Sequence, residues 1–324
     1  MKFTVAAALM ATLAAATPAN LKNAIARRAA TDACDLGYCT ENGGTTGGAS
    51  GETVTVTTVD DLTTYAESDD PYTIIVSGAL SGAAKIRVGS DKTIYGESGS
   101  SLEGVGLYVK GVSNVILRNL KISSVLAENG DAIGIQAASN VWVDHCDLSS
   151  DLDHDKDYYD GLLDVTHASE WVTISNTYLH DHWKASLVGH SDSNADEDTG
   201  TLHVTYANNY FSNINSRQPS VRFGTVHIIN NLWEGAIGTG VNTRMGAQVF
   251  IQSSAFVDCA TKAVESADSD DVGYAVLDDV DLGGSENSAD EGTLSVSSFP
   301  YDTIEALGSS SIASTIPSTA GQTL

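Results

Sequence analysis

The chain has 324 residues and carries 42 acidic against 16 basic side chains, a net charge of −26 at neutral pH. Such a charge argues against nucleic acid and anionic membrane surfaces as partners. No stretch reaches the roughly 18 uninterrupted apolar residues of a membrane-spanning helix. Four cysteines are too few for a disulfide scaffold, and because no Cys-x-x-Cys pair is present we expect neither zinc nor redox chemistry.

The first residues have the layout of a secretory signal peptide. Lys2 is followed by an apolar run and then by three alanines, which predicts removal of residues 1–16. Residues 17–28 end in the pair Arg27-Arg28, which marks either a pro-segment that a dibasic-specific protease removes or a plain surface feature. We therefore predict a secreted, extracellular protein in which residues 29–324 form a single domain.

The next segment predicts a short helix followed by strands. Residues 59–68 place apolar side chains at helical spacing after a capping threonine, Thr57 or Thr58. Strand-like runs follow at 72–78, 85–88, 92–97 and 106–111. If the strands stack into a solenoid, the helix would cover its open end and protect the exposed strand edge.

The middle of the chain repeats one unit, an alternating apolar segment that ends in a small polar residue. The units end at Asn119, His145, Asn176, Asn208, Asn230 and Ser253, so they lie 22 to 32 residues apart. β-Branched strands with this period and no helical pattern between them predict an all-β fold, a parallel β-helix with coils stacked about 4.8 Å apart. Asparagine suits the end of a unit because it tolerates a left-handed backbone in a sharp turn.

The C-terminal part and the cysteines are less regular. From about Ser266 the periodicity fades into Asp, Gly and Ser, which predicts loops that run along the solenoid and close its far end. Cys34 and Cys39 are near enough in sequence to pair with each other. Cys146 and Cys259 lie in apolar runs that are typical of buried positions.

Three acidic residues are candidate ligands for a metal ion. Asp131 belongs to one repeat, and Asp160 and Asp164 belong to the next. An extended strand would hold Asp160 and Asp164 about 13 Å apart, so a shared ion requires a bend near Gly161. With that bend, Asp131 from the preceding coil would complete an all-oxygen site suited to Ca²⁺. Without it, such acidic loops are simply solvated.

Basic residues are rare enough for two groups to be conspicuous. Arg217 and Arg222 flank a proline, and Lys184 lies in an apolar and aromatic run. The bland interpretation is that an arginine pairs with one of the many aspartates and that the lysine only extends its ammonium to water. Nearby, His145 and His182 are expected to form hydrogen bonds within their coils, while Trp183 beside Lys184 is as well suited to stack on a sugar as to pack.

Taken together, these features resemble those of a known protein family. Val-Trp-Val-Asp-His at 141–145, the Asp160/Asp164 pair, the Lys184 segment and Arg217-x-Pro-x-x-Arg222 resemble, in order and spacing, the pectate lyase superfamily, polysaccharide lyase family 1, and its secreted fungal members in particular. The resemblance covers residues 53–265. It implies a right-handed, single-stranded parallel β-helix that cleaves polygalacturonate, the de-esterified form of pectin, by calcium-assisted β-elimination to 4,5-unsaturated oligogalacturonides.

The resemblance also implies roles for single residues. Arg217 would be the general base. The calcium ligands would be Asp131, Asp160 and Asp164. Uronate carboxylates would be held by Lys184, Arg222 and Arg244. Two positions depart from the pattern. Asn129 stands where bacterial members carry a further aspartate, which predicts a lower calcium affinity, and Thr166 stands where some members carry a lysine.

These residues suit the chemistry that the resemblance implies. The proton next to a uronate carboxylate becomes acidic only when that carboxylate's charge is offset, which calcium and Lys184 would do as an enediolate develops. An arginine side chain ordinarily keeps its proton to about pH 12, so a base of this kind predicts an alkaline optimum.

Three alternatives stay open at this point. A polygalacturonase shares the solenoid but hydrolyses with paired carboxylates and needs no arginine base. A pectin lyase acts on methyl-esterified substrate without calcium and would be expected to lack the Asp160/Asp164 pair. A non-catalytic β-helix would bind calcium and polysaccharide without cleaving it. Because loops cover the solenoid edges, we expect a monomer.

Overall fold

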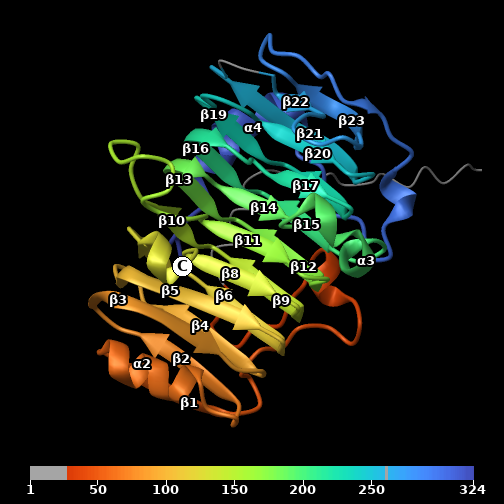
Figure 1. Ribbon diagram of the computed structural model, residues 1–324. Helices are drawn as coiled ribbons and strands as arrows, with labels where there is room; N and C mark the ends of the chain where they lie inside the picture. The colour runs from red at the N-terminus through yellow and green to blue at the C-terminus, as the bar shows by residue number, and fades with distance from the viewer. Residues whose placement is uncertain (1–27, 260–261) are drawn as a thin grey trace, which may run out of the picture.

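The computed structural model describes residues 28–259 and 262–324, and over most of them the chain winds into a stack of parallel strands (Figure 1). Each coil adds strands to three ladders, and all the ladder pairings between consecutive coils are parallel. The predicted parallel β-helix is therefore confirmed. Within the described residues no helix is long and apolar enough to cross a membrane.

The three ladders have the following members. The first comprises β1 (Glu52–Val56), β2 (Tyr72–Val76), β4 (Lys92–Gly96), β6 (Ser113–Arg118), β9 (Ser139–Asp144), β12 (Glu170–Ser175), β15 (His203–Ala207), β18 (Thr225–Ile229), β21 (Gln248–Val257), β23 (Tyr274–Asp281) and β24 (Asp290–Glu291). The second begins with the first parts of β3 (Ala79–Val88) and β5 (Ser101–Lys110) and continues through β7 (Lys121–Ser123), β10 (Asp147–Ser149), β13 (Tyr178–Lys184), β16 (Tyr210–Ser216), β19 (Leu232–Glu234) and the end of β21. The third continues from the later parts of β3 and β5 through β8 (Ile133–Gln136), β11 (Leu163–Thr166), β14 (Ser186–Val188), β17 (Ser220–Arg222), β20 (Val241–Arg244) and β22 (Val264–Glu265).

Within the described residues the helical segments are short and lie outside the ladders. The α-helices are α2 (Val59–Ala66), α3 (Ala195–Asp198) and α4 (Ser309–Thr315). The 3₁₀ turns are η1 (Tyr38–Thr40), η2 (Ala127–Asn129), η3 (Asp192–Asn194), η4 (Val296–Ser298) and η5 (Ile316–Ser318). Helix α2 fulfils the prediction for residues 59–68: the Thr58 hydroxyl accepts a hydrogen bond from the Asp61 N–H at 3.1 Å, and Leu62 and Ala66 are fully buried against the first coils.

The core consists of inward side chains that stack from coil to coil. One row runs through the first ladder as Ile94, Leu117, Val143, Ile174, Tyr206, Ile228 and Ile251. All of these side chains are fully buried. Complete burial of one aliphatic side chain of this size contributes about 1.5–3 kcal/mol, so the repeated β-branched positions are what stabilise the stack.

The turn at the end of the first ladder has the predicted backbone. Its six residues, Asn119, His145, Asn176, Asn208, Asn230 and Ser253, have φ between 48° and 59°. The amide of Asn230 donates to Asn208 Oδ1 of the preceding coil at 3.1 Å. Asparagine therefore adopts the expected left-handed turn, and its amide also bonds one coil to the next.

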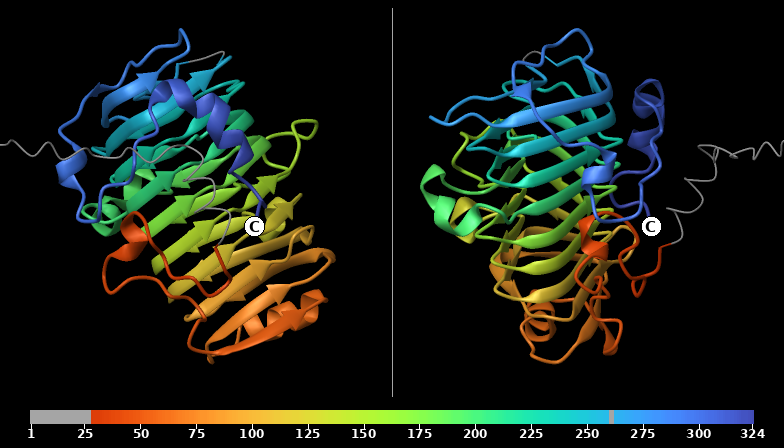
Figure 2. Two further views of the ribbon diagram at one scale, coloured as in Figure 1. Left: turned by 180° about the vertical axis from the view of Figure 1, so that it is seen from behind. Right: turned by 90° about the vertical axis from the view of Figure 1, so that its right-hand side faces the viewer.

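Both ends of the described chain run back along the outside of the solenoid (Figure 2). In the N-terminal segment Cys34 and Cys39 form the disulfide that their spacing allowed, while Cys146 is a buried free thiol. The expectation of loops alone after Ser266 was wrong in part, because β23 continues the first ladder in register with β21. The tail then returns along the turn residues and ends with the Leu324 N–H donating to Asn119 Oδ1 at 3.0 Å.

Candidate active site

The third ladder carries the acidic candidates. Asp164 lies in β11 and is paired in register with Gly134 of β8, and Asp131 lies in the loop just before β8. The bend expected near Gly161 is present at Leu162, and the Gly161 N–H donates to Asp131 Oδ1 at 2.9 Å. A Cβ added to Gly161 would lie 2.8 Å from Asp131 Oδ1 and 2.8 Å from Asp164 Oδ1. Glycine is therefore required for the two carboxylates to approach each other here.

The two carboxylates are crowded and poorly solvated. Burial raises the pKa of Asp131 to about 6, and the nearby charge of Asp160 adds to the effect. Burial also raises the pKa of Asp164 well above its usual range, with a further contribution from Asp131. Raised values show that the protein alone leaves this negative charge uncompensated. A divalent cation would supply the missing compensation, and carboxylate oxygens are the ligands that calcium prefers.

Asp160 is beside this pair but turned toward a different partner. Its Oδ1 lies 3.2 Å from the Lys184 ammonium, and Asp157 lies 3.4 Å from the same ammonium. Accordingly, no cluster of three acidic, histidine or cysteine side chains in the described part of the chain is arranged as a closed metal site. The structure thus brings Asp131 and Asp164 together and places Asp160 next to them, within reach if its side chain rotates away from Lys184.

Arg217 directly follows β16, three residues before β17 begins, and has its guanidinium free. Its backbone has φ of 61°, the left-handed conformation that the turns of this solenoid also use. The Arg217 carbonyl accepts a hydrogen bond from the Ser186 N–H at 2.8 Å, which ties this residue to β14. Its positive charge acts on Asp164, yet across residues 28–259 and 262–324 the guanidinium has no ion pair and no hydrogen bond. It therefore stands unpaired beside buried carboxylates.

Arg222 and Arg244 are neighbours on the same ladder, and both contact the Asp192 carboxylate. They lie opposite each other at the ends of β17 and β20. Asp192 of η3 accepts from Arg222 Nε and lies 3.5 Å from Arg244 Nη2, while Arg222 Nη1 donates to the Gly189 carbonyl at 3.0 Å. Both arginines thus contact an aspartate, as the alternative interpretation expected. They nevertheless remain on the ladder that carries the acidic candidates.

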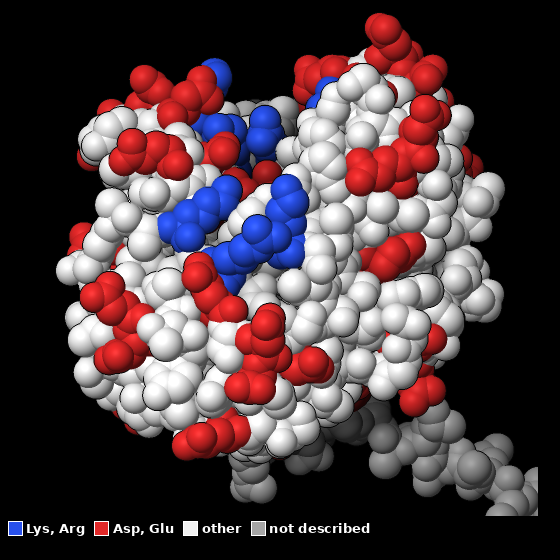
Figure 3. Space-filling view, turned by 60° about the horizontal axis from the view of Figure 1, so that its bottom comes forward, with Lys and Arg blue, Asp and Glu red and all other residues white. Residues whose placement is uncertain are grey.

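The cations are concentrated on one part of the surface. In the view of Figure 3, most visible Lys and Arg side chains gather in and around one hollow that also contains acidic groups, whereas Asp and Glu cover much of the remaining surface. The hollow that the acidic ligand candidates line has a volume of about 250 Å³ and is bounded by Lys85, Tyr108, Asp131, Gly134, Ile135, Gln136, Asp160, Asp164, Thr166, His167 and His190. An acidic protein of net charge −26 thus presents a local site suited to an anionic ligand.

Comparisons with known proteins agree with this arrangement. A family profile described as pectate lyase matches residues 2–271. The chain belongs to the pectate lyase family. It is 70% identical over 318 residues to the probable pectate lyase B of Aspergillus flavus, covering 97% of this chain and 98% of that protein. It is 66% identical over 319 residues to pectate lyase plyB of Emericella nidulans, covering 98% of both.

A solved structure supports both the fold and the family. A pectate lyase from Bacillus sp. N165, crystallised in complex with trigalacturonate, superimposes with a TM-score of 0.79 at 28% identity. The match covers 89% of this chain and 98% of that protein. The resemblance to pectate lyases that the sequence motifs carried is therefore confirmed, and so is the parallel β-helix.

The two departures from the family pattern lie close to the acidic candidates. Thr166 lines the hollow as a buried hydroxyl, so no lysine charge is present at that position. Asn129 ends η2, two residues before Asp131, and its amide Nδ2 is buried with no hydrogen-bond partner in the structure. An unpaired buried amide costs stability.

The histidines that sequence reasoning set aside are held within the coils. His145 Nδ1 lies 2.9 Å from the Asp144 carboxylate, and His182 Nε2 lies 2.6 Å from the Asp160 carbonyl oxygen. Burial lowers the pKa of His182 to about 4, so this ring is neutral at physiological pH. Trp183 donates its indole N–H to the His154 carbonyl at 2.8 Å, which orients it toward the loop before β11.

Sequence reasoning missed several residues of the hollow. Lys85, Tyr108 and Gln136 belong to the first coils of the third ladder, and His167 and His190 flank its later strands. Lys85 and Tyr108 gave only a positional signal, because they occupy outward sites of strands whose inward neighbours are apolar. Asp192, which holds both arginines, lies in a loop with no repeat pattern and gave no signal.

Proposed function

We propose that the protein is a calcium-dependent lyase of polygalacturonate. It would cleave the chain by β-elimination and release 4,5-unsaturated oligogalacturonides. The observation that carries the proposal is the unpaired Arg217 guanidinium, whose charge acts on the buried Asp164 carboxylate, which lines one hollow together with Asp131 and Lys85. Membership of the pectate lyase family supports it, and so does the trigalacturonate bound to the relative from Bacillus sp. N165.

Asp131, Asp160 and Asp164 are the residues that would hold the calcium ion. Their donor set is all oxygen, and the raised pKa of Asp131 reflects negative charge that lacks compensation in the protein alone. When bound, the ion would supply Lewis-acid stabilisation of charge that develops on a uronate carboxylate. Asp160 would leave Lys184 to join the other two ligands, which would free the Lys184 ammonium for the substrate.

Lys184, Arg222 and Arg244 would hold uronate carboxylates and place one sugar against Arg217. Arg217 would first lose its own proton to water and, as the neutral base, would take the proton from the carbon next to the carboxylate. The electron pair of that C–H bond forms the double bond, the bond from the adjacent carbon to the glycosidic oxygen breaks, and the departing oxygen takes a proton from water. No water is added across the cleaved bond, so one product is an unsaturated uronate rather than a hydrolysis product.

The test follows ultraviolet absorbance and reducing ends during digestion of polygalacturonate, first with calcium and then with a chelator. The proposal expects the absorbance of the unsaturated product to grow with calcium and to stop with chelator. Reducing ends without that absorbance would indicate a hydrolase. Activity on methyl-esterified pectin that is insensitive to chelator would indicate a pectin lyase, and binding without either signal would indicate a non-catalytic protein.

We also propose that the protein acts outside the cell as a monomer. The predicted signal peptide, residues 1–16, lies outside the described residues. The described chain covers its own solenoid edges, with α2 over the first coils and the C-terminal tail along the turns. The mass and N-terminus of the protein recovered from culture medium, together with its size in solution, test these points.

A further inference from the structure

The third ladder carries a second group of cations on the N-terminal side of the acidic residues. Strand pairing aligns Tyr108 with Gly134 and Asp164, and it aligns Lys110 with Gln136 and Thr166. The residue between Tyr108 and Lys110, Val109, is fully buried, so these two side chains lie on the outer face. Lys85 of β3 is exposed and lines the same hollow as Asp131 and Asp164.

The two lysines converge on the Tyr108 ring. The Lys85 ammonium lies 4.0 Å from the ring centroid, and the Lys110 ammonium lies 5.8 Å from it. Tyr108 is fixed from its other end by a hydrogen bond from its hydroxyl to Gln136. A tyrosine with its ring directed at two ammonium groups combines positive charge with a flat apolar surface.

These lysines have no acidic partner, in contrast to Lys184 and Arg222. Lys184 pairs with Asp157 and Asp160, and Arg222 pairs with Asp192. Among residues 28–259 and 262–324, no carboxylate lies within ion-pair distance of Lys85 or Lys110. In a protein with 42 acidic residues, two unpaired ammonium groups beside a hollow are available to a negatively charged ligand.

Their distance from the acidic centre fits a long ligand. β5 and β11 are separated by two steps of the ladder, as are β11 and β17. At about 4.8 Å per step, Lys110 and Arg222 each lie roughly 10 Å from the coil of Asp164, on opposite sides of it. Cations therefore flank the acidic centre along about 20 Å of the solenoid axis.

We propose that Lys85, Tyr108 and Lys110 form a distal binding subsite for a uronate unit of the same polysaccharide chain that is cleaved beside Arg217. The ammonium groups pair with the uronate carboxylate and the ring supports the face of the sugar. This inference rests on the proposed function. It makes the enzyme prefer long de-esterified chains, because a short oligomer fills the central site and does not reach this one.

Kinetics on substrates of graded length test the proposal. Lys85→Gln and Lys110→Gln are compared with Lys121→Gln, a matched change on a half-exposed lysine of the second ladder. Each of the first two changes is expected to raise KM for polygalacturonate about two- to fivefold with kcat unchanged, and the effect grows from trigalacturonate to hexagalacturonate. Lys85→Arg and Lys110→Arg restore KM, since they keep the charge.

Several outcomes would overturn it. If both variants match Lys121→Gln on polygalacturonate, no subsite exists at this position. If kcat falls equally for all chain lengths, the lysines act on the acidic centre instead. Failure of the proposed function is recognised separately, because wild type then gives no unsaturated product. Hexagalacturonate binding to wild type and the lysine variants, measured by calorimetry, then decides the subsite.

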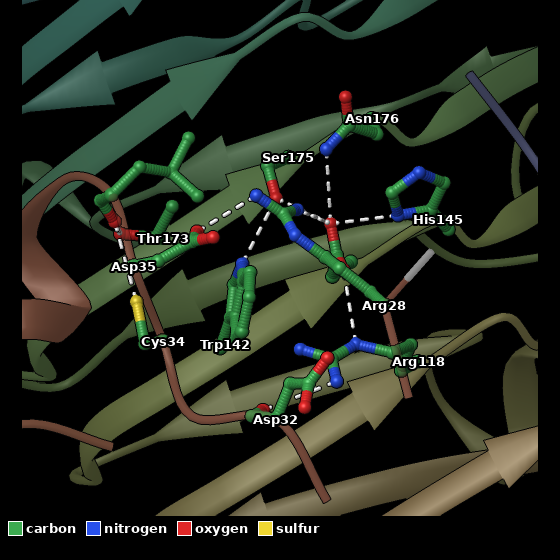
Figure 4. Close-up of polar contacts among 12 residues, drawn as sticks. Arg28, Asp32, Cys34, Asp35, Arg118, Trp142, His145, Thr173, Ser175 and Asn176 are labelled. Carbon is green, nitrogen blue, oxygen red and sulfur yellow. Dashed lines mark hydrogen bonds and ion pairs between the residues drawn. The ribbon is translucent and has the colours of Figure 1, made fainter. Parts of the chain in front are cut away.

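A second inference concerns Arg28, the last residue of the predicted pro-segment. Asp144 at the end of β9 is fully buried and lies 2.9 Å from Arg28 Nη1 and 3.0 Å from Arg118 Nε (Figure 4). Ser175 Oγ donates to the same carboxylate at 2.7 Å, and Asn176 donates at 3.0 Å. Arg28 also pairs with Asp35 at 2.7 Å.

Arg28 is integrated into this cluster rather than placed on the surface. Its guanidinium carbon lies 4.8 Å from the centroid of the Trp142 ring, and only 12% of its side chain is exposed. The pKa of Asp144 is held well below its usual range despite complete burial, because His145 and the two arginines outweigh the desolvation. Loss of one of these cations would leave a buried carboxylate with less compensation.

We infer that Arg28 stays in the mature chain, so that any processing at the dibasic pair occurs on the N-terminal side of Arg28. Mass spectrometry of the secreted protein is expected to show an N-terminus at Arg28 or before it. Arg28→Gln is expected to lower Tm by about 5 °C or more, whereas the matched change Lys156→Gln, at a side chain that is 66% exposed, leaves Tm unchanged. A mature N-terminus at Ala29, or equal Tm for the two variants, would overturn the inference.

Discussion

Gly161→Ala tests whether the approach of Asp131 and Asp164 creates the proposed calcium site. The added methyl group would lie 2.8 Å from an oxygen of each carboxylate, whereas ordinary contacts begin near 3.4 Å. Each oxygen must therefore withdraw by about 0.6 Å, which exceeds the spread of calcium–oxygen distances, about 2.3–2.6 Å. Gly161 does not have a left-handed φ, so the effect comes from the carboxylates and not from backbone strain.

The expected result is a loss of calcium affinity of about tenfold, or about 1.4 kcal/mol. At a calcium concentration of 100 times the wild-type Kd, the ion stabilises the wild type by about 2.7 kcal/mol and the variant by about 1.4 kcal/mol. Calorimetric titration of calcium and the calcium-dependent shift in Tm measure both values. Gly82→Ala is the control, because its Cβ would meet nothing closer than 3.7 Å. Equal calcium affinity in Gly161→Ala and wild type would refute the reasoning.

Two further changes test the site and the core. Asn129→Asp replaces the buried unpaired amide beside Asp131 with a fourth carboxylate, so we expect tighter calcium binding and lower stability in chelator; unchanged calcium affinity by titration would contradict this. Burial lowers the pKa of His227 to about 4. As the pH falls, this imidazole is therefore protonated in the unfolded chain before it is protonated in the folded chain. The ring's contribution, about 3 kcal/mol, is complete above about pH 6.5 and is lost as the pH falls toward 4. His227→Phe, compared with wild type by urea unfolding across this range, should give the flatter curve, and a constant difference between the two would contradict the assignment.

The sequence predicted the parts of the fold that repeat. The turn asparagines, the inward aliphatic positions and helix α2 follow from local patterns, and each is present in the structure. Strand β23 was missed because only Ala275 of its eight residues is buried, so it lacks the alternation that marked the earlier strands. The tail's path along the turn residues depends on bonds such as that from Leu324 to Asn119, which are remote in sequence.

The site was predicted where a motif carried it and missed where stacking alone created it. Tyr108, Gly134 and Asp164 face one another through strand register, although they are 26 and 30 residues apart. Loops of different length between coils hide that register, so neither Tyr108 nor Lys85 could be joined to Asp164 by spacing. The turn of Asp160 toward Lys184 likewise depends on how two coils meet.

The most direct test of the account is the rate at which Arg217→Ala forms unsaturated product from polygalacturonate in saturating calcium. A general base contributes about 10²–10⁴-fold, and Arg217 makes no ion pair whose loss would disturb the fold of the described chain. We expect a loss of that size, with calcium affinity no weaker than that of wild type, because the change removes a positive charge that acts on Asp164. A variant that retains activity within about tenfold of wild type would contradict Arg217 as the base.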